Sequence, residues 1–337
     1  MKKKVFIIAE IGVNHNGSIS RAKKLIDISK DCGADAVKFQ TWKEGEITGK
    51  YTKNLNYIKK NLDKKISRYD LSSSFRLTYH EFEELNKYCK KKKITFMSTP
   101  DGFDSLDFLC KKTNMPIIKI GSSELNHLSF ISKVCDYKKE IFISTGMGDI
   151  KEIRRVVNLL NKKNAKYTVL HCVSEYPTPI NRINILSIKY LKNKLKVPVG
   201  LSDHTTCSTS AIMSVALGAK VVEKHITQDN SLKGPDHKAS LNPRDFKKFV
   251  NDIRNAEKAL GEYSKKPSKV EIKNIKNTRR GVVAKFDIKK GTILKENLLT
   301  SKRPFVDFQP FEIKKLIGKK VNQNLKMDQP ILKKYII

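Results

Sequence analysis

Short apolar runs alternate with amphipathic segments along the first 260 residues of the chain. The apolar runs cover residues 5–9, 36–39, 94–97, 117–120, 141–143, 167–170, 199–204 and 221–227. The amphipathic segments cover residues 19–32, 79–92, 105–111, 128–134, 151–161, 185–191, 208–218 and 245–260. Continuous apolar runs of this length are typical of strands that are buried on both faces. Eight strand–helix units over this length predict a (β/α)8 TIM barrel at residues 1–261.

The pattern changes after residue 261. Residues 262–278 are rich in lysine and contain Pro267, which indicates a linker helix or loop. Short apolar runs separated by glycine and charged turns follow at 279–337 and predict a small β-rich domain. A domain of about 60 residues is marginally stable alone. We therefore expect it to dock on a barrel, either its own or that of a partner chain.

Polar residues recur where the predicted strands end. They are Lys38, Gln40, Thr99, Lys119, Ser122, Glu124, Ser144, Ser174, His204 and His225. The carboxyl ends of barrel strands meet at one mouth, so this recurrence predicts a single site there. The polar segment 41–74 is too long for an ordinary connection and is a candidate lid over the mouth.

Two histidines, His204 and His225, follow neighbouring strands. Two imidazoles at one rim favour a divalent ion with open positions, which could polarise an aldehyde or activate water. Glu10 ends the first strand and could take a proton, and Asp236 in Gly234-Pro235-Asp236 could complete the outer shell. Alternatively, each histidine only bonds a neighbour, Asp236 caps a turn and Glu10 is solvated.

Two lysines and several hydroxyl residues share this predicted mouth. Lys38 and Lys119 lie two strands apart, and the hydroxyl residues near them are Thr99, Ser122, Ser144 and Ser202. Ammonium and hydroxyl groups together form a phosphate and carboxylate pocket. A lysine buried in a barrel could instead form a Schiff base with a carbonyl substrate, and this alternative remains open.

The strong positive charge does not change this interpretation. Lysine and arginine outnumber acidic residues by 68 to 34, but the lysines are scattered along the whole chain, so we expect no nucleic-acid partner. A positive surface still attracts acidic or phosphorylated substrates. Six cysteines without a C-x-x-C pair indicate reduced thiols of a cytoplasmic protein. The apolar run after Met1 is too short for a signal sequence, and no run is long enough to span a membrane.

At these residues the chain resembles the bacterial sialic acid (N-acetylneuraminate) synthase family, including the related legionaminic acid synthases. The matching stretches are AEIGVNHNG (9–17), VKFQ (37–40), STP (98–100), IKIGS (118–122), STGM (144–147), HC (171–172), YPTP (176–179), GLSDH (200–204), EKH (223–225) and GPD (234–236). Residues 287–291 and 302–304 resemble the antifreeze-like (SAF) domain of these enzymes.

The resemblance implies a metal-dependent condensation of phosphoenolpyruvate with an N-acetylated mannose-type sugar. His204 and His225 would hold the metal, a manganese-type ion with Mg²⁺ or Co²⁺ as alternatives, and Glu10 would position or deprotonate the attacking water. The implied phosphoenolpyruvate contacts are Lys38, Thr99, Lys119, Ser122, Ser144 and Ser202. The implied sugar contacts are Gln40, Glu124 and Tyr176, together with Arg303 from the other subunit of a domain-swapped homodimer.

Three departures from the family pattern leave the acceptor open. Ser174 stands where some members carry Asn or Thr, Asp101-Gly102 replaces a frequent Phe, and Phe305 replaces a small residue. The acceptor is N-acetylmannosamine or a 2,4-diacetamido-trideoxymannose, which would make the protein an N-acetylneuraminate or an N,N'-diacetyllegionaminate synthase. Two further alternatives are a sugar-binding module without turnover and a lysine-dependent aldolase.

Overall fold

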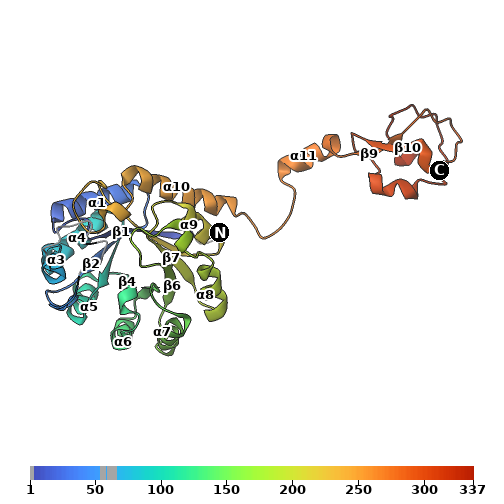
Figure 1. The fold of residues 1–337 in the computed structure, drawn as a ribbon. Coiled ribbons are helices and arrows are strands. Elements are labelled where there is room, and N and C mark those ends of the chain that lie inside the picture. Colours follow the sequence, from blue (N-terminus) through green and yellow to red (C-terminus); the bar gives the residue numbers. More distant parts are fainter. Residues whose placement is uncertain (1–3, 54–57, 59–66) are drawn as a thin grey trace. The chain divides into compact units, whose positions relative to one another are not determined.

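The first unit of the chain, Met1–Gly261, is a closed barrel of eight parallel strands (Figure 1). The computed structural model describes residues 4–53, 58 and 67–337. The strands are β1 (Phe6–Gly12), β2 (Ala36–Thr41), β3 (Thr95–Pro100), β4 (Ile117–Ile120), β5 (Glu140–Ser144), β6 (Tyr167–Cys172), β7 (Val199–Asp203) and β8 (Val221–His225). Each strand pairs with its sequence neighbour, and β1 pairs with β8 to close the barrel. The predicted TIM barrel is confirmed.

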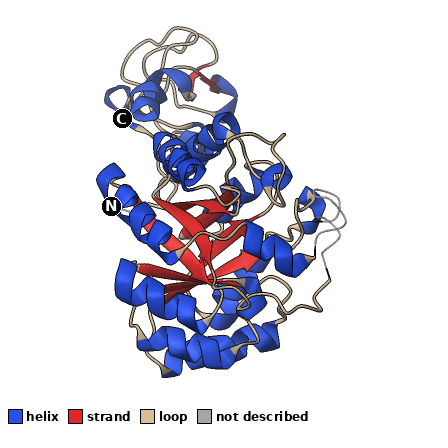
Figure 2. Cartoon of the chain, turned by 90° about the vertical axis from the view of Figure 1, so that its left-hand side faces the viewer, coloured by secondary structure: helices blue, strands red, loops and turns tan. Residues whose placement is uncertain are grey.

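Helices surround the strands, which lie at the centre of the unit in Figure 2. The α-helices are α1 (Ile19–Asp31), α3 (Arg68–Ser74), α4 (Tyr79–Lys92), α5 (Phe103–Phe108), α6 (Leu128–Asp136), α7 (Ile150–Lys162), α8 (Ser187–Leu195), α9 (Thr209–Ala216) and α10 (Pro243–Ala259). Of the candidate lid, α3 is described, whereas residues 54–57 and 59–66 lie outside the described residues. The lid assignment therefore stays a prediction.

Local sequence signals set the helix boundaries. Asp149 accepts hydrogen bonds from the backbone of Lys151 and Glu152, and Glu152 bonds back, which forms a capping box at the start of α7. Along α7 the buried residues recur every three or four positions, at Ile153, Val156, Val157 and Leu160. This spacing puts one apolar face of the helix against the barrel.

Two apolar clusters make up the core of the barrel unit. The larger cluster fills the space between the strands and the surrounding helices. The smaller cluster fills the interior of the barrel and contains Phe6, Ile8, Ala36, Met97, Ile117, Phe142, Leu170 and Val221. These interior residues lie toward the amino ends of their strands and form an apolar floor beneath the mouth.

The second unit, Glu262–Ile337, has its own core. It contains α11 (Lys269–Thr278) and an antiparallel pair of strands, β9 (Gly281–Ala284) and β10 (Leu299–Lys302). Its buried residues include Val282, Leu294, Val321 and Ile331. Residues 262–278, expected to be a linker, are thus grouped with this unit and contain a helix. A small domain with β-strands follows the barrel, as the sequence predicted.

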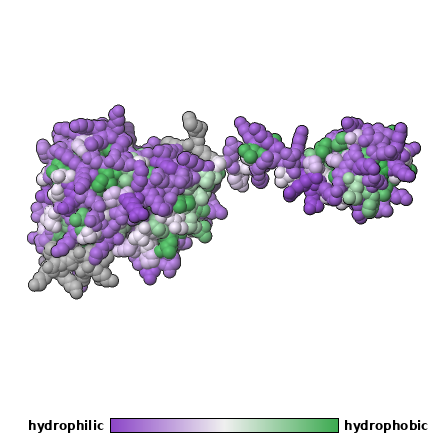
Figure 3. All heavy atoms as spheres, turned by 90° about the horizontal axis from the view of Figure 1, so that it is seen from above, coloured by the Kyte–Doolittle hydropathy of each residue, from purple (hydrophilic) through white to green (hydrophobic). Residues whose placement is uncertain are grey.

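The face of the barrel in Figure 3 is mostly hydrophilic, with separate hydrophobic patches. All six cysteines are free thiols, and five of them are buried. Among the described residues, no helix combines the length and the apolar content needed to cross a membrane.

Candidate active site

The polar site begins one step above the apolar floor of the barrel. Side chains on the same face of a strand recur every second residue. Two residues after floor members come Glu10, Lys38, Thr99, Lys119, Ser144, Cys172 and Glu223. The strands therefore place a ring of polar and ionisable groups directly on an apolar base, at the carboxyl ends where the sequence predicted a site.

Two acidic and two basic side chains form the centre of this ring, and all four are buried. Lys38 Nζ lies 2.8 Å from Glu10 Oε2 and 3.9 Å from Glu223 Oε2. Lys119 Nζ lies 3.8 Å from Glu223 Oε1. The interior is not solvated by bulk water, so these ion pairs are screened much less than surface pairs.

Burial and mutual charge separate the pKa values of these four groups. Burial raises the pKa of Glu10 to about 8, since the repulsion from Glu223 adds to the desolvation and Lys38 offsets only part of it. Burial lowers the pKa of Lys119, although Glu223 opposes the shift. Lys38 has a raised pKa because Glu10 and Glu223 outweigh its desolvation. A carboxyl that titrates near neutral pH is suited to proton transfer.

Hydroxyl groups complete the ring around the two lysines. Lys38 donates to Thr99 Oγ1 at 3.1 Å, and Lys119 donates to Ser144 Oγ at 2.7 Å. Ser202 donates to Glu223 Oε1 at 3.0 Å. The two ammonium groups and the hydroxyls thus lie together at the base of the mouth, as a pocket for an anion requires.

A second group of small residues lies between the ends of β4, β5 and β6. The backbone N–H of Gly146 donates to Ser122 Oγ at 2.9 Å. A Cβ at position 146 would collide with the hydroxyls of Ser122 and Ser174 as they are placed here. Ser122 and Ser174 are therefore neighbours on this side of the mouth.

The two histidines lie side by side at the ends of β7 and β8. Their ring centroids are 5.4 Å apart, and both side chains are buried. The ring of Tyr176 stacks on His204 with a centroid distance of 4.0 Å and meets His225 edge-on at 5.8 Å. The two rings therefore share one position beneath Tyr176 instead of pointing apart.

The nitrogen atoms of these histidines fit a metal ion. His204 Nδ1 donates to the carbonyl oxygen of Val173 at 2.7 Å, which leaves the lone pair on Nε2. His225 Nδ1 is buried without a hydrogen-bond partner among the described residues, and burial and neighbouring charges keep the pKa of this imidazole well below its usual value. In the part of the chain that the structure describes, no group of three or more His, Cys, Asp or Glu could hold a metal. The site thus offers two protein ligands.

Three further residues of the predicted site, Gln40, Glu124 and Asp236, lie in the barrel unit. Gln40 and Glu124 are half-buried at the ends of β2 and β4, and Glu124 bonds His127 at 2.9 Å. Asp236 is buried, and burial raises its pKa to about 6 while His204 and Lys38 lower it. Arg303 is exposed and belongs to the second unit.

The turn after β1 holds the loop that carries Asp236. Asn14 donates to Ile226 O and to Ser240 Oγ, both at 2.8 Å, and Ser240 Oγ donates to the carbonyl oxygen of Asp236 at 2.7 Å. Asn16 Oδ1 lies 3.1 Å from His237 Nε2. The stretch 9–17 therefore has a structural role beyond Glu10, which the sequence alone did not reveal.

Sequence reasoning missed three parts of the site. Glu223 lies two residues before His225 on the same strand face, so the alternation of β8 was a usable signal. Cys172 Sγ lies 4.0 Å from His204 Nδ1, a contact between strands that no motif announces. Lys224 and Asp203 form a fully buried ion pair on the outer face of the barrel. This pair depends on strand register, which the sequence does not give.

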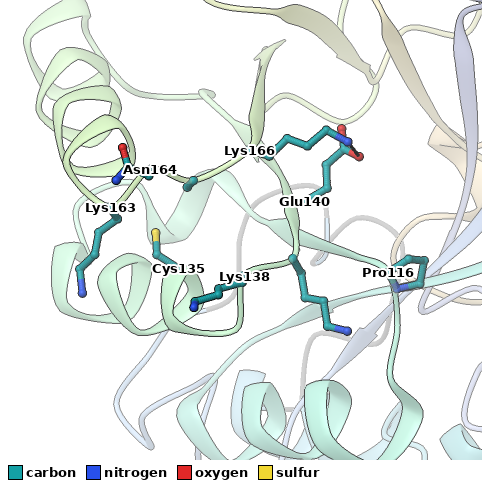
Figure 4. Close-up of a pocket in the computed structure, with 9 residues that line it drawn as sticks. Pro116, Cys135, Lys138, Glu140, Lys163, Asn164 and Lys166 are labelled. Atoms are coloured by element: carbon teal, nitrogen blue, oxygen red, sulfur yellow. Dashed lines mark hydrogen bonds and ion pairs between the residues drawn. The ribbon is translucent and has the colours of Figure 1, made fainter.

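A cavity of about 760 Å³ lies elsewhere and does not belong to this site. Pro116, Glu140 and Lys166, which line it in Figure 4, lie at the amino ends of β4, β5 and β6. Lys166 pairs with Glu140 at 2.8 Å. Active sites of TIM barrels lie at the opposite face, where the charged ring is.

The fold and the site define a (β/α)8-barrel enzyme with an anion pocket beneath two neighbouring imidazoles, followed by a small second domain. Residues 25–265 match the NeuB family, and residues 279–336 match the SAF domain. The chain belongs to the NeuB family. It is a phosphoenolpyruvate-dependent nonulosonic acid synthase, a transferase that forms a carbon–carbon bond.

Full-length relatives agree with this assignment. The chain is 42% identical to an N,N'-diacetyllegionaminic acid synthase of Campylobacter jejuni over 98% of this chain and 99% of that protein. It is 34% identical to the N-acetylneuraminate-9-phosphate synthase of Homo sapiens over 98% of this chain and 92% of that protein. The crystal structure of an N-acetylneuraminic acid synthetase from Leptospira borgpetersenii in complex with citrate is 30% identical, covers 81% of this chain and 90% of its own, and has a TM-score of 0.71.

Proposed function

We propose that the protein condenses phosphoenolpyruvate with an N-acetylated mannose-type sugar and releases inorganic phosphate. The observation that carries this proposal is the position of Lys38 and Lys119 beneath His204 and His225. The two ammonium groups and the hydroxyls of Thr99, Ser144 and Ser202 suit the phosphate and carboxylate of phosphoenolpyruvate. The histidine pair suits the acceptor's carbonyl end.

In the proposed reaction, the methylene carbon of phosphoenolpyruvate forms a bond to the aldehyde carbon of the open-chain sugar. Water then adds to C2, and the carbon–oxygen bond to phosphate breaks. Glu10 is the acid–base group we assign to this water, because its pKa of about 8 lets it exchange a proton near neutral pH. Lys38, 2.8 Å from Glu10, holds that carboxyl in place.

We propose that His204 and His225 hold a divalent ion of the manganese type, with Mg²⁺ and Co²⁺ as alternatives. Such an ion would polarise the acceptor aldehyde as a Lewis acid. The Nδ1–H of His204 is already bonded to Val173, as is common for metal-binding histidines.

Two acceptors are candidates: N-acetylmannosamine and 2,4-diacetamido-2,4,6-trideoxymannose. Relatives at 42% and 36% identity are named N,N'-diacetyllegionaminic acid synthases, and one at 34% is named N-acetylneuraminate-9-phosphate synthase. The test is phosphate release from phosphoenolpyruvate with each sugar and Mn²⁺. Release with either sugar identifies the acceptor, and release with neither refutes the proposal.

We also propose a homodimer in which each barrel receives Arg303 from the partner's SAF domain. Large apolar side chains at the barrel mouth are exposed, including Phe103, Met147 and Ile180, and so are Phe286 and Phe311 of the second unit. Exposed apolar surface of this kind is typical of interfaces. The proposal predicts complementation between two defective chains, because each dimer site combines residues from both subunits.

Mixing Arg303→Ala and His225→Ala chains tests the exchange. A mixed dimer would contain one complete site, formed by the barrel of the Arg303→Ala chain and the SAF domain of the other. With random association, half of the dimers are mixed, so activity should recover to about a quarter of the wild-type value. No recovery, with mixed dimers demonstrated by mass, would refute the exchange.

The lowered pKa of Lys119 makes a Schiff-base mechanism an alternative that can be tested. Burial lowers the pKa of Lys119, as in lysines that form Schiff bases. Borohydride trapping of a substrate adduct on Lys119, with turnover surviving EDTA, would support an aldolase. We favour the anion role because Lys119 already donates to Ser144 Oγ and Ile120 O and pairs with Glu223. Tight sugar binding without turnover would instead support a binding module.

A further inference from the structure

The residue after β3, Asp101, continues the inner face of that strand. Thr99 faces the interior, since its hydroxyl accepts from Lys38. Asp101 lies two residues further along, and its backbone N–H donates to Thr41 O at 2.9 Å, which extends the pairing of β3 with β2. Alternation therefore puts Asp101 on the inner side of the mouth, one step above Thr99.

The side chains one layer above Thr99 include residues that are proposed to contact the acceptor sugar. Gln40 on β2, Asp101 after β3 and His225 on β8 each lie four residues after a residue of the apolar floor. These floor residues are Ala36, Met97 and Val221. Strands β3 and β7 are on opposite sides of the eight-stranded barrel. A sugar whose aldehyde lies at the histidines therefore extends its remote carbons toward Asp101.

One carboxyl oxygen of Asp101 has no hydrogen-bond partner in the described part of the chain. This atom, Oδ2, is buried. Burial and the charge of Glu124 raise the pKa of Asp101 to about 8, and Lys38 opposes the shift. A buried polar atom without a partner is costly, so a ligand that donates a hydrogen bond to it gains affinity.

A clamp on the neighbouring loop fixes Asp101 in this position. The carboxylate of Glu46 accepts from Lys43 N at 2.6 Å and from Asp104 N at 3.0 Å, and it also bonds the hydroxyl of Ser105. A Cβ at Gly102 would collide with Glu46. The turn after β3 is thus tied to the loop after β2, which preorganises Asp101 for a ligand.

We propose that Asp101 is a specificity-determining residue that accepts a hydrogen bond from a hydroxyl or amide N–H on the part of the acceptor sugar remote from its aldehyde. This inference rests on the proposed function. Glu124, at the end of the neighbouring strand, supplies a second carboxyl on the same side. Two adjacent carboxyls match an acceptor that presents donors on neighbouring carbons.

Steady-state kinetics of Asp101→Ala and Asp101→Asn test the inference. Losing a hydrogen bond to a carboxyl should lower kcat/KM for the acceptor by about 10- to 100-fold in Asp101→Ala. The Asn variant keeps an acceptor oxygen and should recover part of the loss. The KM for phosphoenolpyruvate should stay within about threefold of wild type, because that substrate binds one layer below.

Asp104→Asn is the matched control, since Asp104 lies three residues further along the chain than Asp101, at the start of α5, where its exposed side chain pairs with Lys43 on the surface. It should leave both substrates unaffected. Equal losses for both substrates in Asp101→Ala, or an unchanged acceptor kcat/KM, would overturn the inference. Wild-type enzyme that releases phosphate with neither sugar would refute the proposed function itself, whereas an active wild type with an unaffected variant refutes only the role of Asp101.

The pH dependence of the acceptor KM gives a second readout. Glu124, Glu46, Lys38 and Lys119 all influence Asp101 electrostatically, so the profile belongs to the group as a whole. Glu10 also titrates near pH 8, so replacing Asp101 by Asn should reduce the change of the acceptor KM around this pH without abolishing it, while the pH profile of the KM for phosphoenolpyruvate stays unchanged. A profile that is identical in the variant would contradict a direct contact with the acceptor.

Discussion

The buried pair of Lys224 and Asp203 offers a sharp test of how the histidines are held. Lys224 Nζ lies 2.9 Å from Asp203 Oδ2 and 3.2 Å from Thr205 Oγ1, and it also bonds Thr205 O. Both charged side chains are fully buried. Lys224 directly precedes His225, and Asp203 directly precedes His204. The pair therefore joins the two strand ends that carry the histidines.

Replacing Lys224 by Met should destabilise the barrel by about 3–5 kcal/mol, because it leaves the carboxylate of Asp203 buried without a cation. Asp203 would keep its bonds from Thr205 N at 2.9 Å and Ser210 Oγ at 2.7 Å. The double variant Asp203→Asn/Lys224→Met removes both charges; the amide oxygen can still accept from Thr205 N, and the amide nitrogen can donate to Ser210 Oγ. It should lie within about 2 kcal/mol of wild type.

Urea denaturation followed by circular dichroism measures these differences, with the transition of the barrel unit fitted separately. Lys248→Met is the control, since Lys248 forms an exposed pair with Asp252 and should cost less than about 0.5 kcal/mol. Titration calorimetry with Mn²⁺ should also show weaker binding to Lys224→Met. A single-variant loss below about 1 kcal/mol, or additive losses in the double variant, would refute the reasoning.

Three further predictions concern the catalytic groups. His225→Ala should abolish Mn²⁺ binding in calorimetry without changing thermal stability by more than a few degrees; retained affinity would contradict the two-histidine site. The pKa of Glu10 is about 8 in the folded protein and 4.5 for an ordinary glutamate. Between these pH values the folded state binds more protons than the unfolded state, so the free energy of unfolding falls as the pH rises from 4.5 to 8. Glu10→Gln should therefore gain thermal stability relative to wild type between pH 5 and pH 8.5, and a constant difference would refute the shift. Lys119→Met should raise the KM for phosphoenolpyruvate by about 10- to 100-fold with the acceptor KM unchanged, and the reverse pattern would contradict the anion pocket.

The barrel could be predicted because its sequence signals are local. Each strand is an apolar run that needs only its own residues to be recognised, and helices such as α7 carry their own caps and apolar face. The mouth followed from the same logic, since polar residues end one strand after another. Lys38, Lys119 and the two histidines were therefore placed without knowledge of contacts.

The remaining parts of the site depend on which residues meet across strands. Glu223 was overlooked because a buried carboxylate is expected only where cations compensate it, and the sequence does not show that Lys38 and Lys119 lie beside it. Lys224 looked like one more lysine in a chain with many, and only the register of β8 against β7 brings it to Asp203. Asp101 was noted only as a departure from a family pattern. Its importance depends on an unpartnered oxygen atom, which no sequence can show.

The apolar floor and the charged ring explain each other's properties. The floor excludes water from below, so the desolvation that raises the pKa of Glu10 and lowers that of Lys119 comes from the packing of residues such as Phe142 and Leu170. The raised pKa keeps Glu10 largely protonated at neutral pH, so Glu223 is the charged carboxylate of this group of four, and a bound anion would add negative charge beside the lysines. That charge would favour protonated Lys119, and it would make Glu10 still more reluctant to lose its proton. An anionic substrate would thus strengthen the electrostatic state that binds it, and in the proposed reaction Glu10 would give up a proton only at the step that adds water to C2.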